Sequence, residues 1–366
     1  MFGARAFLSF SSRVGVGFLF CGFICGLDKE ISLLLSSTAT KTLGLEWILM
    51  RAHIISLRLL YQNIQYNDVN RLSKKVVLVT GSGRGFGRAI AIAYASEGAK
   101  VVSVARSINE LKDAEKAMKN VGGDVLTLTA DLSVDDGIQH VHDKTMEEFG
   151  GLDVLVNNAA TNSWLTIEDM TLESWDHIIS VNLRAPFALT MAFLHSMKER
   201  GAGNIINITS RSAESTNLAQ LAYCPSKYGL EGLTQSLALE LKEYNIAVNS
   251  LNVASPPGLR LKPTALTLME AEKVPNSVRA LYADDDSMVR HFRDAWVFLA
   301  LQDGSGITGQ RLLTKNLAEV LKNEGEEAAK NLYQGKRILS VYTPIDWPEM
   351  VRYQTPEGGF KEKWFS

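Results

Sequence analysis

A hydroxyl, a phenol and an amine stand close together near the middle of the chain. Ser210 follows an apolar run, and Tyr223 and Lys227 come soon after it, four residues apart. Proline is tolerated in the first turn of a helix but costs about 3 kcal/mol in its interior, so Pro225 places both residues at a helix start. Side chains four apart lie on one helix face. The spacing therefore predicts a phenol and an ammonium that act together.

This pair predicts proton transfer. A free phenol has a pKa of about 10, and lowering it by about three units takes about 4 kcal/mol. One opposite charge at about 4 Å supplies that much at an effective dielectric of 20. We therefore expect the Lys227 ammonium, helped by the helix N-terminus, to lower the pKa of Tyr223. Tyr223 would then protonate a carbonyl oxygen as hydride arrives, or take the proton of an alcohol in the reverse direction.

A glycine-rich loop predicts a dinucleotide site. Residues 80–87 read Thr-Gly-Ser-Gly-Arg-Gly-Phe-Gly, directly after the apolar run Val76 to Thr80 and before a helical segment. Glycine lets the backbone turn tightly and approach a pyrophosphate, and the helix start offers unpaired N–H groups. The strand before and the helix after argue against a merely flexible turn. The candidate cofactor-binding residues of this loop are Gly81, Ser82, Arg84, Gly85, Phe86 and Gly87.

Two arginines indicate which dinucleotide is bound. An acid at the tip of the second strand would accept hydrogen bonds from the adenosine ribose, but Arg106 follows that strand, Lys100 to Ala105, instead. Arg84 lies in the glycine loop. Each arginine alone could be a solvated surface charge, whereas together they can flank a 2'-phosphate with planar, charge-assisted pairing. We therefore expect NADP(H) in preference to NAD(H).

Strand-length apolar runs alternate with longer amphipathic segments, which predicts an α/β fold: a doubly wound, Rossmann-type parallel sheet in a single domain. The predicted strands are Val76 to Thr80, Lys100 to Ala105, Val125 to Ala130, Val154 to Asn157, Asn204 to Thr209, Ala247 to Val253 and Ile307 to Leu313. The predicted helices are Arg88 to Ser96, Ile108 to Lys119, Val134 to Phe149, Leu172 to Lys198, Tyr223 to Tyr244 and Arg290 to Leu301. We place the NADP-binding catalytic domain at residues 72–312, after an N-terminal extension (1–71) and before a C-terminal helix and aromatic tail (313–366).

These motifs resemble the short-chain dehydrogenase/reductase family, in its branch with a Thr-Gly-x-x-x-Gly-x-Gly loop and a Tyr-x-x-x-Lys pair. The resemblance covers about Lys75 to Gln310. It implies that Ser210 hydrogen-bonds the substrate oxygen and that Tyr223 is the general acid/base. Tyr223 and Lys227 would also contact the cofactor, with Lys227 holding the nicotinamide ribose. Asn182 would complete a catalytic tetrad by positioning a water. Taken singly, Asn182 could instead be a buried structural amide and Ser210 a strand-end cap.

The resemblance also implies further cofactor contacts. Asp131 and Leu132 would border the adenine, Asn158 would line the cofactor cleft, and Gly258 would form the turn beside the nicotinamide. For Asp131 the alternative is the start of the next helix.

Some positions depart from the family pattern. Ala160 replaces a glycine, Arg260 stands where a small branched apolar residue is usual, and Gln310 leads into Arg-Leu-Leu-Thr in place of Val-Asp-Gly-Gly. We expect changes near the nicotinamide and in tetramer contacts. Residues 259–286 take the place of the substrate lid, and their apolar members fit either a hydrophobic ketone or ordinary helix packing.

Composition restricts the remaining functions. A net charge of -2 over 366 residues gives no electrostatic footprint for nucleic acid. Three cysteines cannot form a disulfide framework, and no run has the spacing of a metal site, so we expect no metal. We predict an oxidoreductase acting on a small-molecule carbonyl or secondary alcohol, and a homo-oligomer. The alternative is a non-catalytic NADP(H)-binding sensor or scaffold.

The first 70 residues leave several interpretations open. Val14 to Leu27 is uncharged, Arg5 and Arg13 precede it, and no acid appears before Asp28. A secretory signal, a mitochondrial transit peptide, a membrane-surface anchor and a weakly packed extension all fit. We expect a cytoplasmic enzyme, with mitochondrial and membrane-attached placement left open. In the C-terminal piece, a helical stripe is expected to pack on the domain or on a partner subunit. Its members are Leu317, Val320, Leu321, Ala328 and Leu332.

Overall fold

A seven-stranded parallel sheet forms the centre of the molecule. The computed structural model describes residues 70–261, 280–334, 350–355 and 359–364. The strands lie in the order β3-β2-β1-β4-β5-β6-β7, and every neighbouring pair is parallel. Their bounds are β1 Val76–Thr80, β2 Lys100–Ala105, β3 Asp124–Thr129, β4 Val154–Asn157, β5 Gly203–Thr209, β6 Ile246–Asn252 and β7 Arg311–Leu313. The chain runs outward from β1 to β3 and then returns to β4 beside β1, so the predicted doubly wound, Rossmann-type fold is confirmed.

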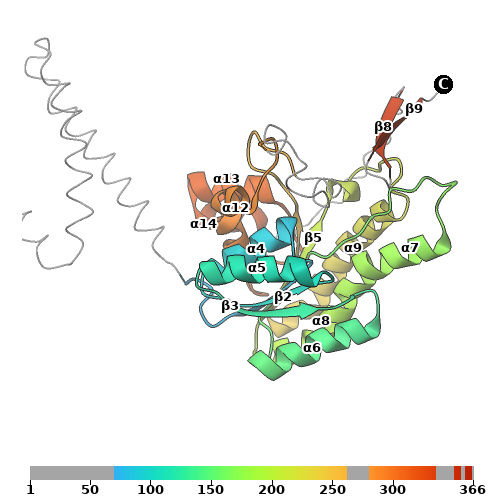
Figure 1. Cartoon of the computed structure of the whole chain (residues 1–366). Coiled ribbons are helices and arrows are strands. Elements are labelled where there is room, and N and C mark those ends of the chain that lie inside the picture. Colours follow the sequence, from blue (N-terminus) through green and yellow to red (C-terminus); the bar gives the residue numbers. More distant parts are fainter. Residues whose placement is uncertain (1–69, 262–279, 335–349, 356–358, 365–366) are drawn as a thin grey trace, which may run out of the picture. The chain divides into compact units, whose positions relative to one another are not determined.

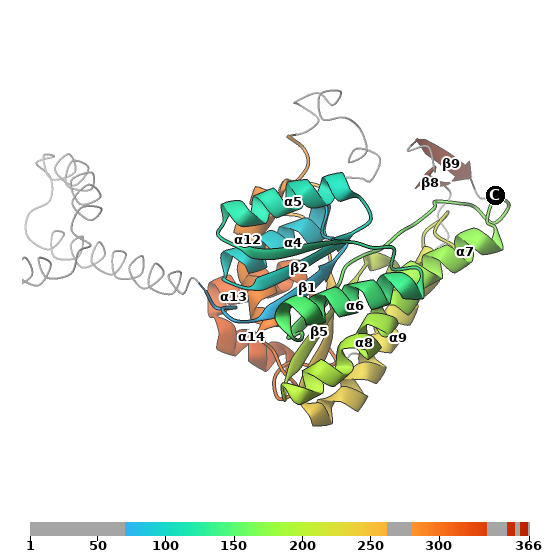
Figure 2. The same cartoon turned by 60° about the horizontal axis from the view of Figure 1, so that its bottom comes forward.

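Helices cover both faces of this sheet (Figures 1 and 2). On one face lie α4 (Gly85–Ser96), α5 (Ile108–Asn120) and α12 (Asp285–Ala300), and on the other α6 (Asp135–Phe149), α8 (Ala185–Glu199) and α9 (Tyr223–Leu241). This explains the near-continuous apolar strands, since a sheet covered on both sides buries every residue of strands such as β1.

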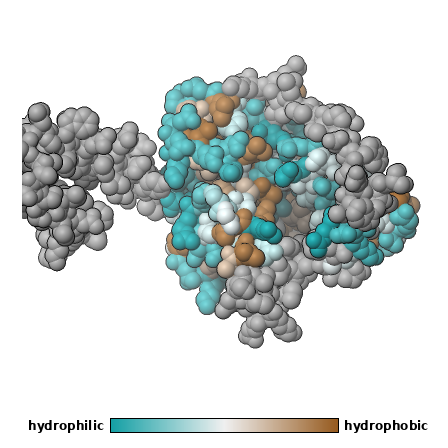
Figure 3. Space-filling view, turned by 90° about the horizontal axis from the view of Figure 1, so that it is seen from above, coloured by the Kyte–Doolittle hydropathy of each residue, from teal (hydrophilic) through white to brown (hydrophobic). Residues whose placement is uncertain are grey.

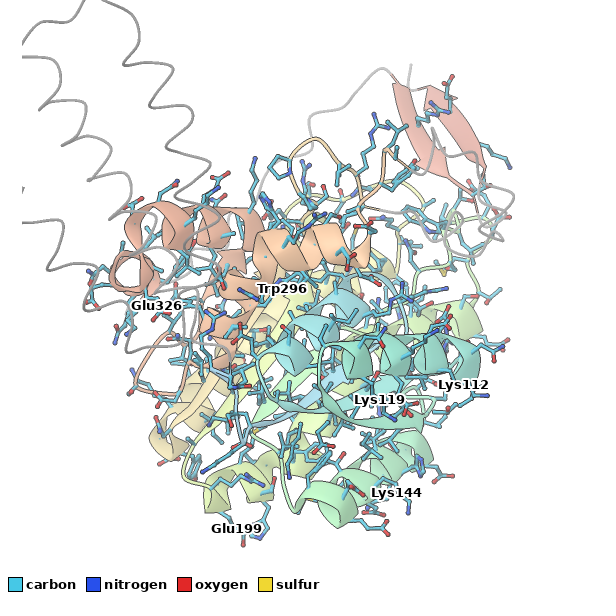
Figure 4. The ribbon with its side chains drawn as sticks, turned by 60° about the vertical axis from the view of Figure 1, so that its left-hand side comes forward. Lys112, Lys119, Lys144, Glu199, Trp296 and Glu326 are labelled. Atoms are coloured by element: carbon cyan, nitrogen blue, oxygen red, sulfur yellow. The ribbon has the colours of Figure 1, made fainter. Side chains whose placement is uncertain are left out.

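Each face of the sheet has its own hydrophobic core. On the α4 and α12 side, Trp296 is fully buried, and its ring meets those of Phe86 and Phe292 edge-on or tilted. Figure 4 marks Trp296 on α12 and the exposed Lys112 and Lys119 on α5. On the face drawn in Figure 3, hydrophilic residues predominate and hydrophobic ones form small scattered groups. The apolar residues therefore mainly stabilise the interior.

The predicted helix Leu172 to Lys198 is divided in the structure. It consists of α7 (Leu172–Ile179), a π-helical turn (Ser180–Arg184) and α8. The whole stretch is long and apolar enough to cross a membrane, but α8 packs against α6 and β5 as a core helix. Sequence periodicity did not reveal the π turn, because one wide turn changes the apolar spacing too little to be recognised.

The first part of the C-terminal piece packs against α12. It forms α13 (Thr314–Glu324) and α14 (Glu326–Tyr333), separated at Gly325, whose φ is +89°. Leu317 is fully buried as predicted, whereas Leu332 is 40% exposed. The break at Gly325 changes the helical register, so Ala329 rather than Ala328 is the fully buried alanine.

An antiparallel hairpin forms where only an aromatic tail was predicted. It pairs β8 (Met350–Gln354) with β9 (Phe360–Trp364). The N-terminal segment 1–69 and most of the predicted substrate lid, 262–279, lie outside the described residues.

Candidate active site

The predicted functional residues meet at one edge of the sheet. Parallel strands all end there, so the loops after β1 to β6 lie along the same edge. The strand order reverses between β1 and β4, and ligands of open α/β sheets bind in the crevice at such a switch point. The glycine loop follows β1 and Asn158 follows β4, so these two segments form the walls of the crevice.

A cavity of about 550 Å³ occupies this crevice. Nine of the predicted cofactor residues line it, and so do several that the sequence did not single out, including Glu110, Thr161 and Val181. The nine are Gly81, Arg84, Gly85, Phe86, Gly87, Arg106, Asp131, Leu132 and Asn158. The cavity thus runs from the glycine loop to the ends of β2 and β3.

Two glycines of the loop leave no room for a side chain. A Cβ on Gly87 would lie 2.2 Å from Nδ2 of Asn158 and 2.5 Å from the Gly81 carbonyl oxygen. A Cβ on Gly81 would lie 2.9 Å from Cα of Ala159, and Gly81 has a φ of +64°. The loop therefore needs glycine both for its turn and for its contact with the loop after β4.

Asn158 holds the two walls of the crevice together. Its Nδ2 donates to the carbonyl oxygens of Thr80 at 2.9 Å and Gly81 at 3.1 Å. In return, the Thr80 hydroxyl accepts the backbone N–H groups of Asn158 and Ala159. The side-chain amide of Asn158 is thus used to shape the glycine loop.

Ser82 was predicted to bind cofactor, but its side chain faces the interior of the fold. Its hydroxyl donates to the carbonyl oxygen of Val79 at 2.8 Å and accepts the N–H of Val104 at 2.9 Å. It also shares a hydrogen bond with Ser103. Ser82 is fully buried and is not among the residues that line the cavity. Its hydroxyl therefore ties β1 to β2.

The arginine side of the cavity contains an acid that the sequence analysis missed. Arg84 Nη1 donates to Oε1 of Glu110 at 3.0 Å, with both side chains about one-third exposed. Arg106 lines the same cavity and is exposed. The signal was the run from Ser107 to Glu110, the pattern of a capping box. Ser107 does cap α5 by accepting the Glu110 N–H. The Glu110 carboxylate pairs with Arg84.

Asp131 and Leu132 stand at the end of β3, as predicted. The Asp131 carboxylate accepts hydrogen bonds from the backbone N–H and the hydroxyl of Ser133, at 2.9 and 2.7 Å. These bonds, with a smaller contribution from Arg106, hold the pKa of Asp131 below its ordinary value. Asp131 is therefore ionised at neutral pH, while Leu132 adds a buried apolar wall.

Ser210, Tyr223 and Lys227 lie together where β5 ends and α9 begins. α9 starts at Tyr223, as Pro225 predicted. The Ser210 side chain hydrogen-bonds the phenol of Tyr223. Lys227 is 2% exposed, its Nζ donates to the Ile208 carbonyl oxygen at 2.8 Å, and it lies 5.8 Å from the centre of the Tyr223 ring.

The charge states of this cluster differ from the prediction. Burial raises the pKa of Tyr223, and the hydrogen bond from Ser210 opposes that shift. The prediction of a lowered pKa was wrong for this arrangement, because burial of the phenol outweighs the opposing hydrogen bond. Burial lowers the pKa of Lys227 to about 8, against the attraction of Glu231. At neutral pH the phenol is protonated and the amine is mostly charged.

Asn182 lies in the π-helical turn and is 1% exposed. Its amide donates to the Thr161 carbonyl oxygen at 2.9 Å and to the Ser226 hydroxyl at 3.1 Å, and it accepts the Thr161 N–H at 2.8 Å. The side chain thus joins the loop after β4 to the start of α9. These side-chain contacts are those of a buried structural amide, the alternative interpretation for Asn182.

The cavity lining does not include Ser210, Tyr223, Lys227 or Asn182. They stand farther along the same sheet edge, beyond β4. Gly258, after β6, is exposed and has a φ of +78°, so it lies in a turn; it does not line the cavity.

Comparisons with known proteins agree with this architecture. Residues 75–257 match the family model described as short chain dehydrogenase. A 3-oxoacyl-acyl-carrier-protein reductase of Thermotoga maritima is 32% identical over 66% of this chain and 96% of its own length. A D-threitol dehydrogenase of Mycolicibacterium smegmatis is 35% identical over 50% of this chain and 70% of its own.

Solved structures give the same result. A metagenomic short-chain oxidoreductase in complex with NADP is 31% identical, with a TM-score of 0.55, over 66% of this chain and 97% of that one. A structure from Beutenbergia cavernae, with NADP at low occupancy, has the same identity and a TM-score of 0.56, over 66% and 96%. The fold and these matches define an oxidoreductase on a Rossmann-type sheet. The chain belongs to the short-chain dehydrogenase/reductase family.

Proposed function

We propose that this protein transfers hydride between NADP(H) and a carbonyl or secondary alcohol, with Tyr223 as general acid/base. The observation that carries the proposal is the cluster of Ser210, Tyr223 and Lys227 at the edge of the sheet that also holds the cavity. A proton donor and a dinucleotide site on one edge are what reduction of a carbonyl requires.

The residues of the cavity fit a nicotinamide dinucleotide. A Cβ on Gly85 would meet nothing within 4 Å, so the loop is open to the cavity where α4 begins, and the free N–H groups of that helix start suit a pyrophosphate. Arg84 and Arg106 supply positive charge at the other end. When bound, the dinucleotide supplies or accepts the hydride.

The protein's own residues handle the proton. The raised pKa keeps Tyr223 protonated at neutral pH, which is the form that donates to a carbonyl oxygen. Ser210, bonded to the phenol, is placed to hydrogen-bond the same oxygen. The buried Lys227 ammonium stabilises negative charge that develops on the phenol. Asn182 positions the start of α9 through Ser226.

The direct test is a screen of ketones with NADPH and with NADH. We expect NADPH to be oxidised by at least one ketone class, and more efficiently than NADH. Binding of NADPH without turnover of any ketone or alcohol would instead support the sensor or scaffold.

Arg106 provides the test of nucleotide choice. If its guanidinium pairs with the 2'-phosphate, Arg106→Ala should weaken NADPH binding by about tenfold or more, because a hydrogen bond to a charged group contributes about 1.5–3 kcal/mol. NADH binding should change much less. Fluorescence titration of both nucleotides measures the two constants, and equal weakening would contradict the phosphate assignment.

Removing the Glu110 carboxylate should strengthen NADPH binding, whereas removing Arg106 should weaken it. That carboxylate competes with a 2'-phosphate for Arg84, so Glu110→Gln is expected to tighten NADPH binding by a few-fold. The effect is modest because such a partly exposed ion pair contributes only about 0.2–1 kcal/mol. Calorimetric titration should show little change for NADH. Weaker NADPH binding by this variant would show that Glu110 supports the site.

We also propose that residues 72–312 form the catalytic domain, that the protein is a homo-oligomer, and that it acts in the cytoplasm. Light scattering on the full chain tests assembly. Deleting residues 1–70, followed by assays of reductase activity and membrane association, tests whether the extension is an anchor.

A further inference from the structure

Arg311 of β7 joins three groups around the candidate active site. Its Nε donates to Oε1 of Glu231 at 2.9 Å, and its Nη2 donates to the backbone oxygen of Ser210 at 3.1 Å. Its Nη1 donates to Glu214, which follows the short helix after Ser210. The Arg311 side chain is 15% exposed. One planar guanidinium therefore binds the Ser210 carbonyl and two carboxylates. This geometry suits arginine rather than lysine.

Glu231 connects this arginine to the proton-transfer pair. It lies one helical turn after Lys227 on α9 and is 12% exposed. One of its oxygens binds Arg311, and the other accepts the Ser250 hydroxyl of β6 at 2.6 Å. Both carboxylate oxygens are thus fixed by neighbouring strands. Its charge acts on the Lys227 ammonium.

We propose that Arg311 and Glu231 are positioning residues for the reaction: Arg311 fixes the backbone at Ser210, and the two together set the charge balance around Tyr223 and Lys227. This inference rests on the proposed function. The charges alternate along the series, from Glu214 through Arg311 and Glu231 to Lys227. Removing one member therefore exposes the pair to an uncompensated charge of known sign.

The groups facing the pair from its surroundings are few among the described residues. Cys224 and Glu231 of α9 act on the pair directly. Arg311 of β7 and Glu214 are linked to it through the bonds of Arg311 to Glu231 and to the Ser210 backbone. Removing a negative charge makes the pair lose a proton at lower pH, and removing a positive charge makes it keep the proton to higher pH. The direction is the same whichever of Tyr223 and Lys227 titrates, because the two are coupled.

The experiment compares kcat/KM for ketone reduction against pH in the full chain and its variants. Reduction needs the proton on the pair, so activity falls on the alkaline side. Glu231→Gln should move that fall to lower pH and Arg311→Met to higher pH, each by about 0.5 pH unit or more. Arg311→Lys keeps the positive charge but loses the planar guanidinium that bonds several groups at once. We therefore expect kcat to fall without a shift in the pH profile of kcat/KM.

Arg293→Met is the matched control, since Arg293 pairs with the buried Glu97 away from this site. It should leave the profile unchanged. Shifts of Glu231→Gln and Arg311→Met in the same direction, or no shift in folded variants that bind nucleotide, would overturn the inference.

A second readout separates this inference from the proposed function. The ultraviolet titration of the Tyr223 phenol is obtained by subtracting the Tyr223→Phe spectrum in each background. If the parent reduces no ketone, the proposed function fails. Even then, opposite shifts of the Tyr223 titration midpoint in Glu231→Gln and Arg311→Met would support the charge coupling. No such shifts would refute it.

Discussion

Tyr223→Phe is expected to reduce ketone turnover by at least about 10²-fold, the usual contribution of a positioned general acid, while nucleotide affinity stays the same. The loss follows because the variant keeps the ring but removes the proton that the buried phenol carries at neutral pH. Affinity should persist because Tyr223 is not among the residues that line the cavity. Steady-state kinetics and nucleotide titration of the same preparation measure both quantities.

Tyr244→Phe is the control for this substitution. Tyr244 lies just after α9, and its ring sits under the Lys198 ammonium, a contact that phenylalanine retains. Turnover should match the parent. If Tyr223→Phe turned over within about twofold of the parent, Tyr223 would not be the proton donor.

Lys227→Met should separate activity from stability. Turnover is expected to fall by at least about 10²-fold, because the charge that stabilises the developing phenolate is lost. Stability at pH 7 should rise. The pKa of Lys227 falls from 10.5 to about 8 on burial, so holding the charged form costs about 3 kcal/mol below pH 8. The variant also loses the hydrogen bond to Ile208, which costs about 1 kcal/mol, so its free energy of unfolding should rise by about 2 kcal/mol in total.

The pH dependence gives this prediction its sign. Between about pH 8 and 10.5 the unfolded state binds the lysine proton more tightly than the folded state, so the parent gains stability as pH rises. The methionine variant has no such gain. Urea unfolding should therefore show an advantage of the variant that is largest at pH 7 and shrinks towards pH 10. The prediction would be contradicted if the variant were less stable than the parent at pH 7, or if its advantage increased with pH. Either result would mean that burying the Lys227 ammonium does not destabilise the parent.

The fold and much of the candidate site could be predicted because each rests on local signals. Pro225 fixed the start of α9 at Tyr223, and the apolar run before the glycine loop gave β1 with the bounds observed. Periodicity and helix-start chemistry act over a few residues, so one sequence displays them directly.

The missed features depend on contacts between distant segments. Glu110 carried a capping-box signal, but nothing local showed that its carboxylate would reach Arg84, 26 residues earlier. Likewise Arg311 was noted only as a departure from the family pattern, although it bonds Ser210 across 101 residues. Side-chain direction also escaped prediction, as the inward hydroxyl of Ser82 shows.

The amide of Asn158 has a consequence for anyone who re-engineers this protein. It bonds Gly81, a residue 77 positions away, and a Cβ on Gly87 would collide with it. The glycine loop and the segment around Asn158 are far apart in the sequence but depend on each other for their conformation. Transplanting a glycine loop from a relative to alter nucleotide preference should succeed only when the segment around Asn158 is exchanged with it.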